Sequence, residues 1–144
     1  MTSDTDTVTG HCVCKAYTVT IPRPTQMNLC HCVDCRRWAG SMRYSAHVGA
    51  PADKVKLEGP KPRTHSVKGV DGENMIRACG LYIMPESRAE KGPSFFKAGA
   101  KLMFVGLFNP GDVPTPTMET FTKDMESWET TARGVNAFEK NGKF

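Results

Sequence analysis

The chain has 144 residues, a formal net charge of +4, and 39% hydrophobic against 24% charged residues. This length fits one domain, and the composition is close to that of a soluble globular protein, slightly poor in apolar residues. The basic residues are dispersed, so charge does not demand a nucleic-acid partner, and no apolar run approaches the length of a membrane span.

The first residues, 1–7, are polar and acidic, and we expect them to form a disordered tail in front of a single domain that spans 8–140. This tail lacks the basic start and the apolar stretch of a secretory signal. We therefore expect a cytoplasmic protein, in a compartment where thiols stay reduced.

Short strands separated by turn residues are predicted along most of the chain. The segment 15–21 is rich in β-branched residues and ends at Pro22 and Pro24, and 34–39 is predicted to be a short helical turn closed by Gly40. Further strands are predicted at 42–48, 55–57, 64–70, 74–78, 81–84, 94–97, 102–107 and 118–122, with a hairpin turn at Asp71-Gly72 and loops at 85–92 and 109–116. No segment has a long helical period, so the sequence predicts a mainly β domain with little helix.

Cysteines are unusually dense in one part of this sequence. The six cysteines are Cys12, Cys14, Cys30, Cys32, Cys35 and Cys79. Three thiols within six residues are typical of a site for a soft metal such as zinc. Disulfides are the weaker interpretation, because the chain shows no secretory signal and Cys-x-Cys pairs are too close in sequence for easy mutual bridging.

The central thiols of Cys30, Cys32 and Cys35 can converge on one ion if the chain folds back as a knuckle. Three protein ligands on zinc leave a fourth position for water or substrate, which is the arrangement of a catalytic site. The alternative is that Cys79 or a distant histidine closes the site as a structural one. His31 should point away from its neighbours, so ligation and a role beside the ligands both remain open.

Arg36 and Arg37 follow the central cysteines directly. Cations at this place would balance the negative charge of three thiolates on a divalent ion, and could also bind a carboxylate of a substrate. The alternative is a solvated basic turn with no part in the chemistry.

The order of the cysteines, with arginine after the central group and glycine after the last, resembles the glutathione-dependent formaldehyde-activating enzyme family, which includes the centromere protein V domain. The matching segments are Gly10-His11-Cys12-Val13-Cys14, then Cys30-His31-Cys32-Val33-Asp34-Cys35-Arg36-Arg37 with Gly40-Ser41, then Arg77-Ala78-Cys79-Gly80, with lesser similarity at Leu57-Glu58-Gly59 and Trp128. The resemblance spans roughly residues 8–140.

The resemblance implies an Mss4-like fold of several small antiparallel sheets with two zinc sites. It implies that Cys30, Cys32 and Cys35 are the ligands of a reactive zinc beside the place where glutathione binds. It also implies that the three outer cysteines are the remainder of a structural zinc site; these are Cys12, Cys14 and Cys79.

The outer site departs from the family pattern at Ile76, where the family has the first cysteine of a Cys-x-x-Cys pair. An aliphatic side chain cannot donate to zinc, so three thiolates must recruit a fourth ligand, accept water, or stay without metal. The sequence offers His11, His65 and Glu73 as candidates. We expect no tightly bound structural zinc here; redox activity of the three thiols is an alternative that their spacing alone does not favour over inert burial.

The resemblance and the central cluster together predict a zinc-dependent carbon–sulfur lyase, or a related enzyme that acts on a glutathione conjugate or on an aldehyde-derived thiol adduct. Arg36, Arg37 and Arg43 would face the acidic peptide, the partner would be a small thiol, and a homodimer stays open. One alternative is a non-enzymatic module in which zinc is structural and which binds nucleic acid or protein. Another is a scaffold that has lost both its metals and its chemistry.

Overall fold

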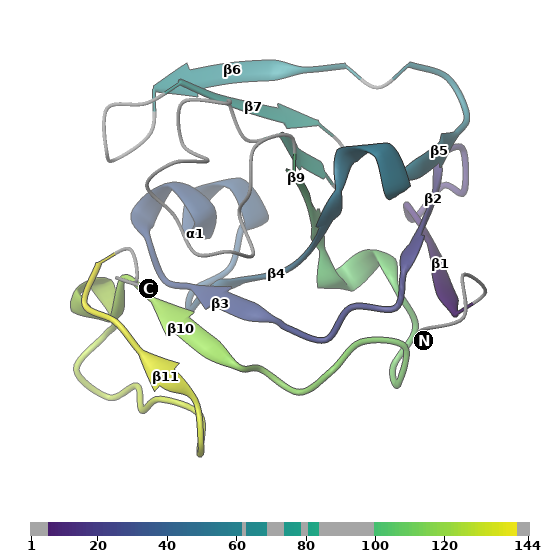
Figure 1. Cartoon of the computed structure of the whole chain (residues 1–144). Helices are drawn as coiled ribbons and strands as arrows, with labels where there is room; N and C mark the ends of the chain where they lie inside the picture. The colour runs from purple at the N-terminus through teal and green to yellow at the C-terminus, as the bar shows by residue number, and fades with distance from the viewer. Residues whose placement is uncertain (1–5, 62, 69–73, 79–80, 84–99, 141–144) are drawn as a thin grey trace.

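The computed structural model describes residues 6–61, 63–68, 74–78, 81–83 and 100–140, and these residues form a mainly β protein with little helix (Figure 1). The elements in chain order are β1 (Thr7–His11), β2 (Thr18–Pro22), β3 (Asn28–Cys30), α1 (Val33–Ala39), β4 (Ser45–Pro51), η1 (Ala52–Lys54), β5 (Lys56–Glu58), β6 (His65–Lys68), β7 (Asn74–Ala78), β8 (Leu81–Ile83), β9 (Ala100–Phe104), η4 (Val105–Leu107), β10 (Met118–Thr120), η5 (Thr122–Asp124) and β11 (Asn136–Ala137). The predicted fold class is confirmed. No helix among the described residues is long and apolar enough to cross a membrane.

Within the described residues the strands form two sheets. The smaller sheet has the order β1-β2-β5, and the larger has the order β11-β10-β3-β4-β9-β8-β7-β6. Most neighbours pair antiparallel, whereas β10 pairs parallel with both β3 and β11. The larger sheet curls around α1, with β3 and β10 on one side of the helix and β6 and β7 on the other (Figure 1).

Helix α1 ends at the predicted residue and begins one residue before the predicted start, at Val33. Cys32 is the N-cap residue, and its sulfur accepts a hydrogen bond from the backbone N–H of Cys35. Gly40 ends the helix in the left-handed conformation at φ 62°, a conformation that costs glycine little because it has no Cβ. Trp38 on this helix stacks on His65 of β6, with ring centroids 6.1 Å apart, which ties the helix to the far end of the larger sheet.

Several predicted boundaries were wrong by a few residues. The first predicted strand begins at Thr18 because Lys15 lies in the left-handed region at φ 59° and turns the chain. The strand predicted at 42–48 is β4, which begins at Ser45. The segment 102–107 divides into β9 and the 3₁₀ turn η4, and the strands β1, β3 and β11 were not predicted. Thr7, assigned by the sequence to the tail, is the first residue of β1.

Other predictions fall partly or wholly outside the described residues. The two strands around the predicted hairpin exist as β6 and β7 and pair antiparallel, but the turn at Asp71-Gly72 is not described. The same holds for the loop at 85–92, for the strand at 94–97 and for Cys79.

The main hydrophobic core lies between the two sheets. In β1 and β2 alternate residues are buried, as expected for strands with one face against a core, and β3 is buried along its whole length. The buried members of this core are Val8, Cys12, Tyr17, Val19, Ile21, Met27, Leu29, Val48, Ala50, Met103 and Phe108. A second, smaller cluster consists of Cys30, Cys32 and Cys35 with Phe121 packed against it.

Candidate metal centre

Three cysteines converge where β3 passes into α1. Cys30 is the last residue of β3, Cys32 caps the helix, and Cys35 lies in its first turn. Their sulfur atoms all lie within 4.8 Å of one another, and each residue is at most 7% exposed. Among the described residues, this is the one group of three ligating side chains that is compact enough to hold a metal ion. The predicted convergence of these thiols is confirmed.

The arrangement of these sulfurs fits a zinc ion. Zn–S bonds of about 2.3 Å in a tetrahedron place the sulfurs about 3.8 Å apart. The three sulfurs are already within a short side-chain adjustment of that spacing. The donor set is all thiol, which suits a borderline-soft ion such as zinc better than a hard ion such as magnesium.

The surroundings of the cluster disfavour the thiolate form of two of its cysteines, Cys30 and Cys32. The pKa of Cys30 is raised well above its ordinary value by its interactions with Cys32 and Cys35 and by burial. A hydrogen bond with Cys30 lowers the pKa of Cys32, but the neighbouring Cys35 thiol and burial outweigh it, so this pKa is raised too. Three thiolates at this place therefore need a cation to balance their charge, and metal binding should release protons.

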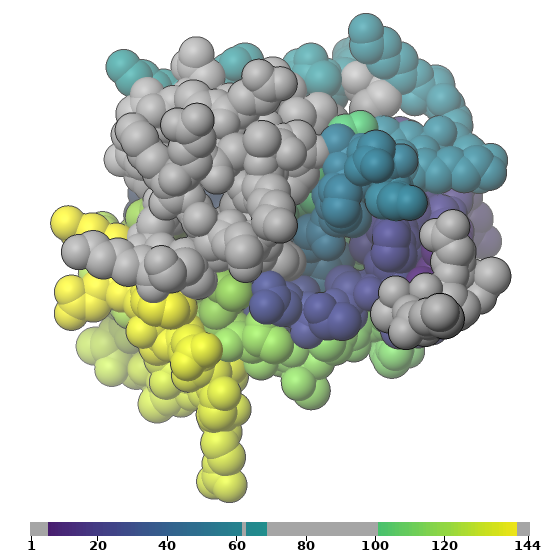
Figure 2. Space-filling model, viewed as in Figure 1, coloured from purple at the N-terminus to yellow at the C-terminus, as the bar shows by residue number. Residues whose placement is uncertain are grey.

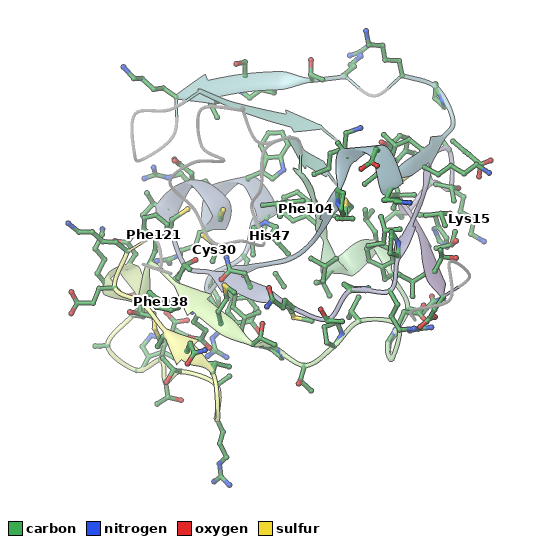
Figure 3. All side chains as sticks on the ribbon, in the orientation of Figure 1. Lys15, Cys30, His47, Phe104, Phe121 and Phe138 are labelled. Carbon is green, nitrogen blue, oxygen red and sulfur yellow. The ribbon has the colours of Figure 1, made fainter. Side chains whose placement is uncertain are left out.

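Phe121 covers the thiols from the direction of β10. It is partly buried and packs against the three-cysteine cluster, as its place beside Cys30 in Figure 3 illustrates. Its backbone is in the left-handed region at φ 58°, which is unusual for an aromatic residue and is found at sites where the surrounding structure imposes it. The sequence analysis missed this residue, and no local signal in the sequence identifies it.

His31 lies between two of the thiols but faces away from them, as the strand geometry predicts. Its ring is 1% exposed, and its Nε2 lies 3.1 Å from Oε2 of Glu119 on β10. Its Nδ1 lies 3.2 Å from the carbonyl oxygen of Arg43. The other carboxylate oxygen of Glu119 accepts a hydrogen bond from the backbone N–H of Ala132 at 2.8 Å. His31 therefore fastens the cysteine segment to β10 through Nε2, and to the residues just before β4 through Nδ1.

Glu119 is a second residue that the sequence analysis missed. It is 2% exposed, within a strand whose three residues are all buried. A carboxylate inside a short predicted strand is a sequence signal that a buried partner exists, although it does not identify that partner.

Two of the three predicted substrate arginines contact carboxylates of this chain. Arg36 donates to the side chain of Glu126 at 3.1 Å and to the carbonyl oxygen of Asp124 at 3.2 Å. Arg43 donates from Nε to Glu129 at 3.0 Å, and the Glu129 side chain is fully buried. Burial raises the pKa of Glu129, but the backbone N–H of Glu126 and the Arg43 guanidinium outweigh burial and hold this pKa below its usual range.

These contacts place residues 125–140, here called the C-terminal segment, against the cysteine segment. The space-filling view shows the end of the chain in yellow at one edge of the molecule, next to the green residues near β10 (Figure 2). Arg37 has an exposed side chain on α1, and Arg43, although it pairs with Glu129, keeps 43% of its side chain exposed. Trp128, one of the lesser similarities to the family, lies in the C-terminal segment and is 58% exposed.

The two outer cysteines that are described lie far from this centre. The sulfurs of Cys12 and Cys14 are 3.4 Å apart, with Cys12 buried and Cys14 exposed. A hydrogen bond from Cys14 lowers the pKa of Cys12, and burial opposes this effect more weakly. Figure 3 shows Lys15, the residue after Cys14, at the opposite end of the molecule from Cys30.

The described candidates for a fourth outer ligand have other contacts. His11 Nδ1 lies 2.8 Å from the carbonyl oxygen of Cys12, and the His65 ring stacks on Trp38 of α1. Ile76 lies on β7, paired with Ser66 of β6 and Ile83 of β8. Glu73 and Cys79 lie outside the described residues. Within the described part of the chain, the outer site therefore consists of two thiols, those of Cys12 and Cys14.

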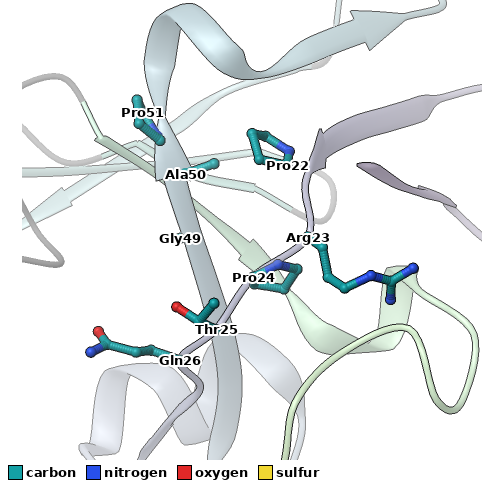
Figure 4. Close-up of a pocket in the computed structure, with 8 residues that line it drawn as sticks. All are labelled: Pro22, Arg23, Pro24, Thr25, Gln26, Gly49, Ala50 and Pro51. Carbon is teal, nitrogen blue, oxygen red and sulfur yellow. The ribbon is translucent and has the colours of Figure 1, made fainter. Parts of the chain in front are cut away.

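A shallow pocket of about 190 Å³ lies away from the cysteines (Figure 4). Its walls come from the end of β2 with the segment after it and from the end of β4; the lining residues are Pro22, Arg23, Pro24, Thr25, Gln26, Gly49, Ala50 and Pro51. The Arg23 side chain is paired with Asp6 and donates to the carbonyl oxygen of Asp112. We therefore assign no chemistry to this pocket.

Comparison with known proteins gives the same assignment as the cysteine order. The model of the family described as glutathione-dependent formaldehyde-activating enzyme matches residues 7–124. A search of curated proteins found no significant match. The matched region runs from β1 to η5 and contains the three-cysteine cluster, whereas Glu126 and Glu129 lie beyond its end. Because the match covers most of the 144 residues, the chain belongs to the glutathione-dependent formaldehyde-activating enzyme family.

Proposed function

We propose that this protein is a zinc-dependent enzyme that makes or breaks a carbon–sulfur bond in a glutathione adduct, such as the adduct of glutathione with an aldehyde. The observation that carries the proposal is the compact, buried group of three sulfurs in a member of this family. Three thiol ligands leave the fourth position of a tetrahedral ion open to a substrate.

Cys30, Cys32 and Cys35 would hold the ion. Zinc bound there would lower the pKa of a thiol in its fourth position and polarise an adjacent carbonyl group. In the direction of adduct formation, the thiol sulfur attacks the aldehyde carbon, a C–S bond forms, and the carbonyl oxygen takes up a proton. In the lyase direction the same C–S bond breaks, and thiol and aldehyde are released.

The other residues of the centre would position this chemistry. Phe121 packs on the cluster and would keep water away from one side of the sulfurs. Arg37 would bind a carboxylate of glutathione, because its side chain is exposed and lies two residues beyond Cys35. Arg36 and Arg43 would act through Glu126 and Glu129, by holding the C-terminal segment in place, rather than by direct contact with the peptide.

Residues 8–140 would act as one domain in the cytoplasm, with a small thiol as the partner. A salt-sensitive interaction with DNA would instead favour the non-enzymatic interpretation.

The decisive experiment measures metal and glutathione on the same preparations. We expect the reduced protein to bind zinc at the central cluster and to bind glutathione in isothermal titration calorimetry. Cys32→Ser should lose both, whereas Cys14→Ser, an exposed cysteine outside the cluster, should keep both. Full-strength glutathione binding by Cys32→Ser would contradict the proposal.

A second pair of variants tests the role of Arg37. Arg37→Met should weaken glutathione binding about tenfold with no change in zinc content, because one charge-assisted hydrogen bond is lost at an exposed site. Arg133→Met changes an exposed arginine of the C-terminal segment and serves as the matched control. Equal affinity in the two variants would remove Arg37 from the binding site.

A further inference from the structure

The Cys12–Cys14 pair has a geometry that the central cluster lacks. The two sulfurs are 3.4 Å apart, which is already close contact for two thiols that are not bonded. Cys14 is exposed, whereas Cys12 is 6% exposed and belongs to the main hydrophobic core. The Cys14 thiol is thus accessible to a reagent, and the buried Cys12 thiol is in contact with it.

A tight turn holds the two thiols together. The backbone N–H of Lys15 donates to the carbonyl oxygen of Cys12 at 2.9 Å, and the N–H of Cys12 donates to the carbonyl oxygen of Tyr17 at 3.1 Å. The left-handed conformation of Lys15 completes the reversal of the chain. Val13, the residue between the two cysteines, is fully exposed, so the tip of the turn can adjust without disturbing the core.

Gly59 braces this turn from the side. Its φ is +120°, and a Cβ at this position would collide with the carbonyl oxygen of Ala16. The close approach of Gly59 to Ala16 keeps the turn folded back against the end of β5. The backbone turn that carries Cys12 and Cys14 is therefore held both by its own hydrogen bonds and by the packing of Gly59 against Ala16.

We propose that Cys12 and Cys14 are a reversible redox pair that forms an intramolecular disulfide on reaction with a low-molecular-weight disulfide, for which oxidised glutathione is the probe. This site is separate from the central cluster, and the proposal does not rest on the proposed function.

The reaction proceeds in two thiol–disulfide exchanges. The exposed Cys14 thiolate attacks one sulfur of the small disulfide, so that a mixed disulfide forms and one small thiol leaves. The Cys12 thiolate then attacks the Cys14 sulfur, the protein disulfide forms, and the second small thiol leaves. The protein loses two electrons and two protons, and the small disulfide gains both to become two thiols.

The ring that results explains why the reaction would be reversible. A disulfide across a single intervening residue is a small ring whose geometry departs from the relaxed one, and strained or exposed disulfides are the more easily reduced ones. The central thiols, by contrast, are all buried, and access controls the rate of exchange.

The test uses the reduced 144-residue protein, both with and without added zinc, exposed to graded ratios of oxidised to reduced glutathione. After alkylation of the remaining thiols, trypsin cleavage after Lys15 separates Cys12 and Cys14 from the central cysteines. We expect the peptide 1–15 to lose two hydrogens and to regain them with dithiothreitol, whereas the peptide that holds Cys30, Cys32 and Cys35 keeps three alkylated thiols.

Two variants distinguish a Cys12–Cys14 disulfide from a disulfide that involves Cys79. Cys12→Ser should accumulate one glutathione adduct on Cys14, and Cys79→Ser should oxidise like the unmodified protein. The proposal is overturned if Cys79→Ser no longer oxidises, if Cys12 or Cys14 pairs with Cys79 instead, or if both thiols of peptide 1–15 stay reduced in excess oxidised glutathione. Should Cys12→Ser fail to fold, the Cys79→Ser result and the peptide map of the unmodified protein still decide the matter.

Discussion

The two described groups of cysteines in this protein differ in how the chain supports them. The central cluster is held by residues distant in sequence, since Glu119 contacts His31 across 88 positions and Glu129 contacts Arg43 across 86. The Cys12–Cys14 pair is held mainly by its own turn, through hydrogen bonds between residues at most five positions apart. In the central cluster each thiol is buried beside two others. In the Cys12–Cys14 pair each thiol has one neighbour, and Cys14 is exposed. The number of neighbouring thiols, their burial and the contacts that hold them, rather than residue type, distinguish the candidate metal centre from the proposed redox pair.

Of the changes considered, removal of the metal from the central cluster should have the largest effect on stability. Chelation, or Cys32→Ser, should reduce the free energy of unfolding by several kcal/mol, with an upper bound on the order of 10 kcal/mol, because metal binding to a thiolate site is coupled to folding. Denaturant unfolding of the zinc-loaded and stripped protein measures the effect. The double variant Cys12→Ser with Cys14→Ser should keep the zinc content of the unmodified protein. A lower zinc content would show that the outer cysteines contribute to zinc binding.

Loss of the long-range contacts that support the cluster should have the second-largest effect on stability. Glu119→Ala leaves the His31 ring and the Ala132 N–H without their buried acceptor, and we expect a loss of roughly 2–5 kcal/mol in stability. Zinc affinity should fall as well, because the cysteine segment loses its attachment to β10. Absorbance of the cobalt-substituted protein reports metal affinity separately from folding. Glu139→Ala, at an exposed position, is the control, and equal losses in the two variants would exclude a supporting role for Glu119.

Disturbing the local support of the pair should have a smaller effect. Gly59→Ala places a Cβ against the Ala16 carbonyl in a conformation that favours glycine, so we expect a loss of about 1–3 kcal/mol in stability and slower disulfide formation at Cys12 and Cys14. Gly134→Ala is the matched control, since Gly134 also has a positive φ, of 77°, but faces open space. Thermal unfolding and the rate of thiol loss measure the two effects. Unchanged oxidation in Gly59→Ala, with stability reduced, would show that the turn does not depend on this contact.

The smallest expected effect is on the pH dependence of stability. The pKa of Glu129 is lower in the folded protein, where Arg43 and the Glu126 N–H favour the carboxylate, than in the unfolded chain, where a glutamate has a pKa of about 4.3. A group with a lowered folded pKa stabilises the protein above its unfolded pKa, and this contribution is lost as the pH falls through the folded pKa. Glu129→Gln should therefore reduce stability at pH 7 and flatten the loss of stability between about pH 5 and pH 3. Thermal unfolding of both proteins across this range provides the check, and parallel pH profiles would contradict it.

Much of the centre was predictable because its signals are local. The spacing of Cys30, Cys32 and Cys35 places three sulfurs on one turn of chain, and the cap at Gly40 is decided by the residue's own backbone freedom. The alternation of apolar residues likewise predicted a mainly β fold, with errors at strand ends where a single residue such as Lys15 turns the chain.

The partners of the centre could not be read from local patterns. Arg36 and Arg43 were predicted to face a substrate, yet their guanidinium groups contact Glu126 and Glu129, because the parallel pairing of β10 with β3 brings the C-terminal segment to the cysteines. Phe121 reaches the thiols for the same reason.

The sequence by itself determined which residues can bind a soft metal, where the helix beside them begins and ends, and to which family the pattern is similar. The tertiary structure alone decided what surrounds those residues, which arginines pair with carboxylates of the C-terminal segment, and that Cys12 is buried while Cys14 is exposed. The physical reason is that thiol chemistry and backbone conformation are properties of a few neighbouring residues, whereas burial, ion pairing and access depend on which distant strands lie side by side.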